Sequence, residues 1–340
     1  MQVGTALAAR GWEIVVAGRN GAELLKRAEA SGLPTVSWPF KRDFDLATAR
    51  AASRWIRNNP PDAVLVNTGR DIRSVGLAAM RHNIPVVWRM GPKPKNNLVH
   101  RLTGALISHV IAPSETVYRE LQKFSWLKDK ITVIHNGITI TPRPSDEQIQ
   151  AARAMLGLPN DKFLCLYVGR LMTGKGIDTL IDAFAKVSRV SPSAILWIVG
   201  NGPSDGTARE KVAKLGINNV VSFTGYSTDP SVYFAACDLF VLPSRYESFS
   251  YVLLEAMLHA KPCVATRAGA IPEVVGQDAA VLVPPASADA LADAISKLIG
   301  DSERRTELAG KGRERVIDHF DLNKTVDAVE SLFRTLVKTA

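Results

Sequence analysis

The stretch CDLFVLPSRYESFSYVLLEAM, residues 237–257, decides the fold. Its first part, CDLFVLPS, is an apolar run that predicts a buried strand ending in a Pro-Ser turn. The run VLLEAMLHAKP that follows predicts a helix closed by Pro262. Glu247 lies in the entry loop of this helix, and Glu255 lies about two turns into it. Because a helix N-terminus carries free N–H groups and partial positive charge, this unit predicts a phosphate seat flanked by carboxylates, the shape of a nucleotide-sugar site. Two surface glutamates on a solvated helix are the alternative.

Length and composition are those of a globular protein with two domains. The 340 residues suffice for about two hydrophobic cores. Apolar residues make up 46% and charged residues 22%, and no apolar run approaches the ~18–20 residues of a membrane span. Each cysteine lies in or beside an apolar run without metal-ligand spacing, which predicts buried thiols of a cytosolic protein: Cys165, Cys237 and Cys263. The six histidines show no ligand spacing, so we predict no metal site.

The excess positive charge lies in the N-terminal half. Residues 1–150 contain 21 Lys and Arg against 12 Asp and Glu, whereas residues 151–340 contain 21 of each. Such asymmetry favours an anionic partner, and a generally basic solvated surface is the alternative. No helix-turn-helix, RNA-recognition or zinc-finger pattern accompanies the basic half. We therefore expect no nucleic-acid partner.

Apolar runs alternate with helix-like stretches along the chain, which predicts α/β domains with parallel sheets. Two doubly wound, Rossmann-like units result, one in each half. Ligands of such sheets bind beyond the carboxyl ends of the strands. The predicted strands are 12–18, 35–40, 62–69, 84–91, 109–114, 130–137, 163–169, 194–200, 219–225, 239–244, 262–269 and 279–285.

The boundary between the halves is predicted in HNGITITPRPSDEQ, residues 135–148, where Asn-Gly and prolines follow a strand. We expect an N-terminal domain over residues 1–140 and a C-terminal domain over 141–312. Residues 313–340 form a helical segment expected to cross back to the N-terminal domain. The first residues, MQVGTALAARGW, have a helical pattern with no strand ahead of it, so we expect that the domain's first strand is missing.

A basic loop precedes the decisive stretch. In LYVGRLMTGKGIDTLIDAF, residues 166–184, Arg170 and Lys175 lie between a predicted strand and a predicted helix, and glycines let the backbone approach a ligand. Two fixed cations suit a pyrophosphate leaving group, because negative charge builds on it as the bond breaks. Alone this loop is a weak signal, and it becomes specific in combination with the glutamate pair.

A second glycine-rich turn offers an alternative. WIVGNGPSDG, residues 197–206, puts Gly200 and Gly202 after a strand, as in a dinucleotide-binding fingerprint. The third glycine is displaced to Gly206, and no acidic residue ends the next strand. Close backbone approach to a nucleotide remains predicted, while an NAD-linked oxidoreductase is kept as an alternative function.

Five motifs together resemble glycosyltransferase family 4, the retaining nucleotide-sugar enzymes of GT-B fold, in the type that builds bacterial surface glycans and lipopolysaccharide. They cover most of the second half in order: GRLMTGKG, VGNGP, FTGY, LPSRYESFSYVLLEAM and IPEVV. The first half resembles the family more loosely, through SETVYREL and the IHNG turn. The resemblance implies two Rossmann-like domains that face each other across a cleft.

The resemblance also implies roles for individual residues. Arg170 and Lys175 would clamp the donor diphosphate, Glu255 would hold the ribose hydroxyls, and Glu247 would face the donor sugar. The implied catalytic residues are Arg170, Lys175 and Glu247. Ser250 stands where the family usually has glycine. Backbone N–H groups of residues 249–251 would seat the sugar or its phosphate, and Tyr226 would lie near the base; the implied donor-binding residues are Gly169, Gly202, Tyr226, Ser248, Phe249, Ser250, Tyr251 and Glu255.

The first half departs from the family pattern. Its acceptor-side candidates are Asn67, Asp71, Arg89, Lys93 and Lys95. The segment Arg89–Met90–Gly91 has no histidine where the family often places one against the donor sugar. Cations mixed with apolar residues over 88–110 favour a lipid-linked or phosphorylated acceptor at an acidic membrane surface, and a solvated loop is the alternative. Asp43 and Asp45 form a D-x-D that does not follow a strand, so it predicts no metal site.

The resemblance therefore implies a hexosyltransferase-like enzyme that moves a sugar from a UDP- or GDP-sugar to a hydroxyl of a cell-envelope glycan or lipid-linked saccharide, with retention. The nucleotide sugar is a substrate, and we expect no cofactor and no metal. We expect a cytoplasmic protein, peripheral at the inner face of the plasma membrane. Besides the oxidoreductase, a non-catalytic nucleotide-sugar-binding relic is the remaining alternative.

Overall fold

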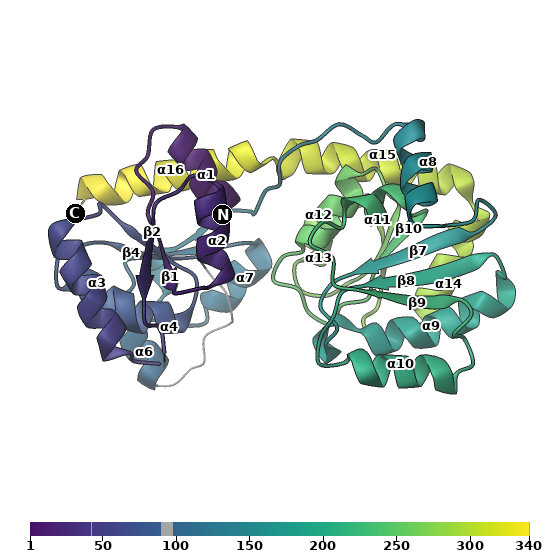
Figure 1. The fold of residues 1–340 in the computed structure, drawn as a ribbon, viewed down its shortest axis with the longest axis horizontal. Helices are drawn as coiled ribbons and strands as arrows, with labels where there is room; N and C mark the ends of the chain where they lie inside the picture. Colours follow the sequence, from purple (N-terminus) through teal and green to yellow (C-terminus); the bar gives the residue numbers. More distant parts are fainter. Residues whose placement is uncertain (42, 90–97, 340) are drawn as a thin grey trace. The chain divides into compact units, whose positions relative to one another are not determined.

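The computed structural model describes residues 1–41, 43–89 and 98–339 (Figure 1). The chain divides into two compact units. Unit 1 comprises residues 1–137 and 322–340, and unit 2 comprises residues 138–321. The change of unit at residue 137 lies close to the predicted boundary at 140. The predicted terminal segment 313–340 is divided, because its residues up to 321 belong to unit 2 and the rest to unit 1.

Unit 2 is built on a six-stranded parallel sheet in the order β12-β11-β10-β7-β8-β9. The order reverses at the centre, where β7 pairs with β8 on one side and with β10 on the other. A reversal of this kind is the topological switch point of a doubly wound sheet. The strands are β7 (Phe163–Val168), β8 (Ala194–Val199), β9 (Val221–Gly225), β10 (Leu239–Leu242), β11 (Cys263–Thr266) and β12 (Val281–Val283).

Helices cover both faces of this sheet (Figure 1). One face packs against α9 (Ile177–Val190), α10 (Asp205–Lys214) and α14 (Ala288–Gly300). The other packs against α8 (Asp146–Met155), α11 (Ser231–Ala236), α12 (Tyr251–Leu258) and α13 (Ile271–Val275). Helix α15 (Ser302–His319) contacts both α12 and α14.

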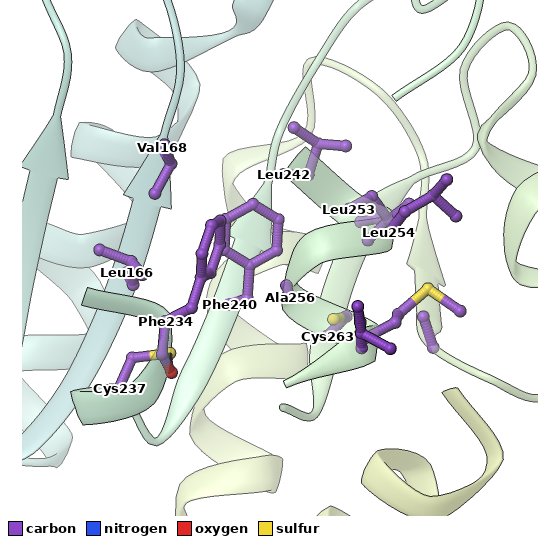
Figure 2. Close-up of a cluster of buried hydrophobic side chains, with 14 of the residues drawn as sticks. Leu166, Val168, Phe234, Cys237, Phe240, Leu242, Leu253, Leu254, Ala256 and Cys263 are labelled. Carbon is purple, nitrogen blue, oxygen red and sulfur yellow. Dashed lines mark hydrogen bonds between the residues drawn. The ribbon is translucent and has the colours of Figure 1, made fainter. Parts of the chain in front are cut away.

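The two faces follow from the alternation of side chains along a strand. In β7, Cys165 and Tyr167 belong to the core under α9, whereas Leu166 and Val168 belong to the core under α12. Figure 2 shows the second core, where side chains of β7 and β10 lie close to Phe234 of α11 and to the apolar side chains of α12. Buried apolar residues thus fix both strands that flank the switch point.

Unit 1 contains two parallel sheets, a two-stranded one in the order β1-β2 and a four-stranded one in the order β3-β4-β5-β6. Helices α1 and α16 share a core with Val87 and Ile111, and α3, α5 and α7 pack on the opposite face. The strands are β1 (Val16–Arg19), β2 (Thr35–Trp38), β3 (Val64–Val66), β4 (Val86–Arg89), β5 (His109–Ala112) and β6 (Ile131–Val133). The helices are α1 (Gln2–Ala9), α2 (Glu23–Ala30), α3 (Leu46–Asn58), α4 (Gly69–Asp71), α5 (Leu77–Met80), α6 (Leu98–Ala105), α7 (Glu115–Leu121) and α16 (Leu322–Thr339), with a π-helical turn at Ile72–Gly76.

Each of the twelve predicted strand runs overlaps an observed strand, and the predicted α/β class with parallel sheets is confirmed. All three cysteines are buried and unbridged, and burial raises the pKa of each thiol. Among the helices of the described residues, none is both long enough and apolar enough to cross a membrane.

Candidate functional site

Two loops leave the sheet of unit 2 at its switch point. The first loop, residues 169–176, follows β7, and the second, residues 243–250, follows β10. Because β7 and β10 are parallel neighbours, their carboxyl ends lie at one edge of the sheet. The first loop carries Arg170 and Lys175, and the second carries Glu247. The topology therefore brings the three predicted catalytic residues to adjacent loops.

Lys175 and Glu247 form an ion pair across these loops. The Lys175 Nζ lies 2.6 Å from Glu247 Oε1, and the Ser244 hydroxyl donates to the same oxygen at 2.8 Å. The Glu247 side chain is 7% exposed and that of Lys175 is 29% exposed. A buried carboxylate needs such partners, because an unpaired buried charge is costly. Sequence reasoning missed Ser244, for which the Pro-Ser turn gave no specific signal.

Two glycines allow the backbones to come this close. Gly176 has φ +68°, and a Cβ on it would lie 2.0 Å from the Pro243 carbonyl oxygen. Gly269, which follows β11, has φ +53°, and a Cβ there would lie 2.0 Å from the Glu247 carbonyl oxygen. No side chain fits at either position, so the loops are fixed against each other and against residues 269–270, where Ala270 N–H donates to the Glu247 carbonyl at 2.8 Å. Gly269 was not among the predicted site residues.

Arg170 is exposed at the start of the first loop. Its carbonyl accepts a hydrogen bond from the buried Tyr167 hydroxyl at 3.2 Å. Burial, and secondarily the charge of Glu247, raises the pKa of Tyr167, so this phenol stays protonated and donates. Arg170 is thus exposed to solvent, while its backbone is held by the hydrogen bond from Tyr167.

The second loop ends at the N-terminus of α12. Ser250 is the N-cap residue with extended backbone, yet its side chain makes no capping bond. Its Oγ is buried and has no hydrogen-bond partner among the described residues. The first turn of α12 carries no acidic residue, whereas that of α9 carries Asp178. Among the described residues neither helix has a side-chain cap, so the N-terminus of α12, which no carboxylate in its first turn compensates, is the better site for an anion.

Glu255 lies in α12 and is half-buried. Because the helix begins at Tyr251, Glu255 is a little over one turn from its start rather than the predicted two. Burial raises the pKa of Glu255, and the nearby Asp229 raises it further. Asp229 belongs to the β9–α11 loop, which also carries Tyr226, a tyrosine that is 62% exposed.

The remaining donor-side residues lie in the same group of loops. Phe249 is buried and packs its ring on Tyr251 and Phe320, with centroids 5.7 and 5.8 Å away. The Tyr251 ring is 40% exposed at the first position of α12. Ser248 is half-buried in the second loop, and Gly169 opens the first. The structure therefore places the predicted donor residues at the carboxyl edge of one sheet.

Gly200 and Gly202 have a packing role. A Cβ on Gly200 would lie 2.0 Å from the Gly169 carbonyl oxygen, and one on Gly202 would lie 2.2 Å from that of Leu171. The turn supports the first loop through the N–H of Leu171, which donates to the Asn201 carbonyl at 2.9 Å. Loop packing therefore accounts for the glycines that suggested a dinucleotide fingerprint.

The acceptor-side candidates of unit 1 are more dispersed. Asn67 is exposed after β3, and Arg89 ends β4 and donates to the buried Asn136. The structure gives Asp71 a local role, since it forms a capping box in which its carboxylate accepts from Thr68 N–H at 3.0 Å. The pattern T-x-x-D was a signal for this box that sequence reasoning passed over. Lys93 and Lys95 lie outside the described residues, as does Met90.

The D-x-D has structural partners too. Asp45 caps α3, and Asp43 pairs with Arg73 at 2.8 Å. Throughout residues 1–41, 43–89 and 98–339, the structure has no group of three or more His, Cys, Asp or Glu that could hold a metal ion.

These features define a protein of GT-B type, with two Rossmann-like units and a basic, carboxylate-bearing loop pair at the switch point of the second. Residues 148–315 match the family model "Glycosyl transferases group 1", and residues 1–141 match "Glycosyltransferase Family 4". The chain therefore belongs to the GT-B glycosyltransferases of family 4 type.

Similar proteins agree with this membership. The chain is 30% identical to the lipopolysaccharide core biosynthesis glycosyltransferase LpsE of Rhizobium meliloti, over 71% of this chain and 67% of LpsE. It is 33% identical to the putative teichuronic acid biosynthesis glycosyltransferase TuaC of Bacillus subtilis, over 68% of this chain but only 57% of TuaC.

Solved structures show the same fold. A glycosyltransferase from Rickettsia africae gives a TM-score of 0.84 at 20% identity, covering 100% of this chain and 94% of that one. Anabaena HepE, solved in complex with UDP-glucose, gives 0.86 at 24% identity, covering 98% of this chain and 94% of that one.

Proposed function

We propose that this chain transfers a sugar from a nucleoside-diphosphate sugar, with UDP or GDP as the carrier, to a hydroxyl group, with retention of the anomeric configuration. Family membership supports a glycosyl transfer, and the solved complex of HepE with UDP-glucose supports a nucleotide-sugar donor.

The observation that carries this proposal is the Lys175–Glu247 pair at the switch point. Lys175, Arg170 and the uncapped N-terminus of α12 supply positive charge where two loops meet. A diphosphate gains negative charge as its bond to the sugar breaks, and fixed donors stabilise it without reorganising. Arg170 and Lys175 would bind the diphosphate, and release of Lys175 toward phosphate would leave Glu247 to accept from a sugar hydroxyl.

Glu255 would accept hydrogen bonds from the ribose hydroxyls, and Tyr226 would lie near the base. A half-buried carboxylate is a strong acceptor for two vicinal hydroxyls. For retention, the leaving phosphate would help to deprotonate the acceptor, so that no separate protein base is required. This chemistry needs no metal, and we expect transfer to continue in the presence of EDTA.

The acceptor would be a cell-envelope glycan or a lipid-linked saccharide. The names of LpsE and TuaC support this class. Arg89 would contact a phosphorylated or lipid-linked acceptor, and an enzyme acting on such an acceptor would work in the cytoplasm at the inner face of the plasma membrane.

Thermal-shift screening against UDP-, GDP- and ADP-sugars tests the donor. A ligand that binds only the native state raises the melting temperature. NMR of the product then compares its anomeric configuration with that of the donor, and inversion would contradict the proposal. A shift with nicotinamide dinucleotides and none with nucleotide sugars would favour an oxidoreductase, and donor binding without transfer to any acceptor would favour a non-catalytic protein.

A further inference from the structure

A second ion pair joins the second loop to helix α9, which follows the first loop. Arg245, two residues before Glu247, donates through its guanidinium to Asp178 Oδ2 at 2.6 Å. Asp178 lies in the first turn of α9, three residues after Lys175. The backbone N–H of Arg245 also donates to the Gly174 carbonyl at 2.9 Å. Arg245 thus contacts the first loop just before Lys175 and helix α9 just after it.

The geometry of Asp178 fits a fixed attachment. Its Oδ1 is buried without a hydrogen-bond partner among the described residues, so only Oδ2 is available to Arg245. A carboxylate in the first turn also interacts favourably with the dipole of α9, which has no side-chain cap of its own. The bond from Arg245 to Asp178 Oδ2 therefore links the second loop to the helix that begins where the first loop ends.

We propose that Arg245 and Asp178 form a clasp that positions Lys175 for the donor diphosphate, a role that rests on the proposed function. Lys175 is paired with Glu247 in this structure, and it must turn toward phosphate when a donor binds. The clasp keeps the first loop in place during that exchange, because its contacts do not involve the Lys175 side chain. Arg245 and Asp178 are positioning residues and do not touch the reacting atoms.

Exposure limits the size of the effect. The Arg245 and Asp178 side chains are 35% and 44% exposed, so water screens the pair and its contribution to folding is small. Its consequence lies in the placement of Lys175. We expect a roughly fivefold loss of donor affinity when the clasp is opened, the upper end of what an exposed pair supports.

A double-mutant cycle tests the clasp. Calorimetry measures the Kd for whichever of UDP and GDP the unchanged chain binds, in Asp178→Asn, Arg245→Gln and the double variant. Each single change and the double change should weaken binding by the same factor of about five, because either removes the whole clasp. Arg245→Lys should restore most of the affinity, and the melting temperatures should stay within about 2 °C.

Asp278→Asn is the matched control. Asp278 pairs with Lys311 at the same distance of 2.6 Å. It precedes β12 and so lies at the amino ends of the strands, away from the loops at their carboxyl ends. It should leave the Kd unchanged. Unchanged affinity in Asp178→Asn would overturn the clasp, and so would a double variant whose loss is the product of the single losses, since Arg245 would then contact the ligand itself. If the unchanged chain binds neither UDP nor GDP, this result contradicts the proposed function itself rather than the clasp alone.

Discussion

The carboxyl edges of the sheets differ between unit 2 and unit 1. In unit 2 the central strands β7 and β10 are paired on both sides, and all four residues of β10 are buried. In the described part of unit 1, β3 ends its sheet, Leu65 in it is 39% exposed, and β1 and β2 form a separate sheet. A strand order that reverses between neighbours arises only among the described strands of unit 2.

The loops differ in the same way. At the switch point of unit 2, ion pairs, close backbone contacts and two obligatory glycines hold the loops together. In unit 1, Asp71 satisfies its own helix start and Asn67 is exposed. In unit 2 the loops after two adjacent parallel strands are held together by side-chain and backbone contacts, and the described loops of unit 1 have no such set of contacts between Asn67 and Asp71. Under the proposed function, the donor would bind to unit 2 and the acceptor to unit 1.

The largest expected effect comes from Lys175→Ala. Removing this cation should reduce the rate of transfer by about a thousandfold, because the charge on the leaving diphosphate loses a fixed donor. The control is Lys211→Ala, since Lys211 is equally exposed, at 30%, and pairs with Asp182 at 2.5 Å on the helices of the same unit. Turnover assays should show full activity for the control, and a Lys175→Ala variant as active as wild type would break the assignment.

The close approach of the loops is tested by Gly269→Ala. The added Cβ meets the Glu247 carbonyl and the backbone has positive φ, so we expect a loss of about 3 kcal/mol in the free energy of unfolding. Gly174→Ala, in the first loop, meets no atom within 4 Å and should cost much less. Urea unfolding of both variants gives the difference. Equal stabilities would mean that the loops are not held together as described.

Arg89→Ala sharpens the contrast between the units. If unit 1 binds the acceptor, this variant should raise the KM for the acceptor about tenfold through loss of a charge-assisted contact, with the KM for the donor unchanged. Steady-state kinetics with each substrate varied in turn separates the two. A rise in the donor KM alone would contradict this prediction and indicate that Arg89 contacts the donor.

The smallest effect is expected at the far end of α12. Ala260 has φ +52° in the turn that closes this helix, where Lys261 N–H donates to the Ala256 carbonyl at 3.0 Å. Ala260→Gly should stabilise the protein by about 0.5–1 kcal/mol, because glycine adopts this conformation without steric cost. Ala213→Gly, inside α10, should destabilise it by a similar amount. Thermal unfolding would contradict the account if both changes had the same sign.

The strands were predictable because apolar runs of β-branched and aliphatic residues are bounded by Gly, Pro and Asn. Lys175 and Glu247 are 72 residues apart in the sequence, so local patterns could not predict that they pair. Only the family motifs suggested that their loops lie together. The clasp between Arg245 and Asp178 and the approach of Gly269 depend on side-chain direction and loop geometry, for which a linear pattern carries no signal. The predicted depth of Glu255 was wrong, because α12 begins at Tyr251, directly after the extended backbone at Ser250, and Glu255 is only four residues further on.

Calorimetric titration of UDP and GDP into wild type, Lys175→Ala and Arg89→Ala tests the central claim most directly, since it separates the two units without requiring an acceptor. We expect wild type to bind one of the two nucleotides, Lys175→Ala to weaken this binding by at least about tenfold, and Arg89→Ala to leave it unchanged. Wild-type affinity in Lys175→Ala, or a loss confined to Arg89→Ala, would contradict it.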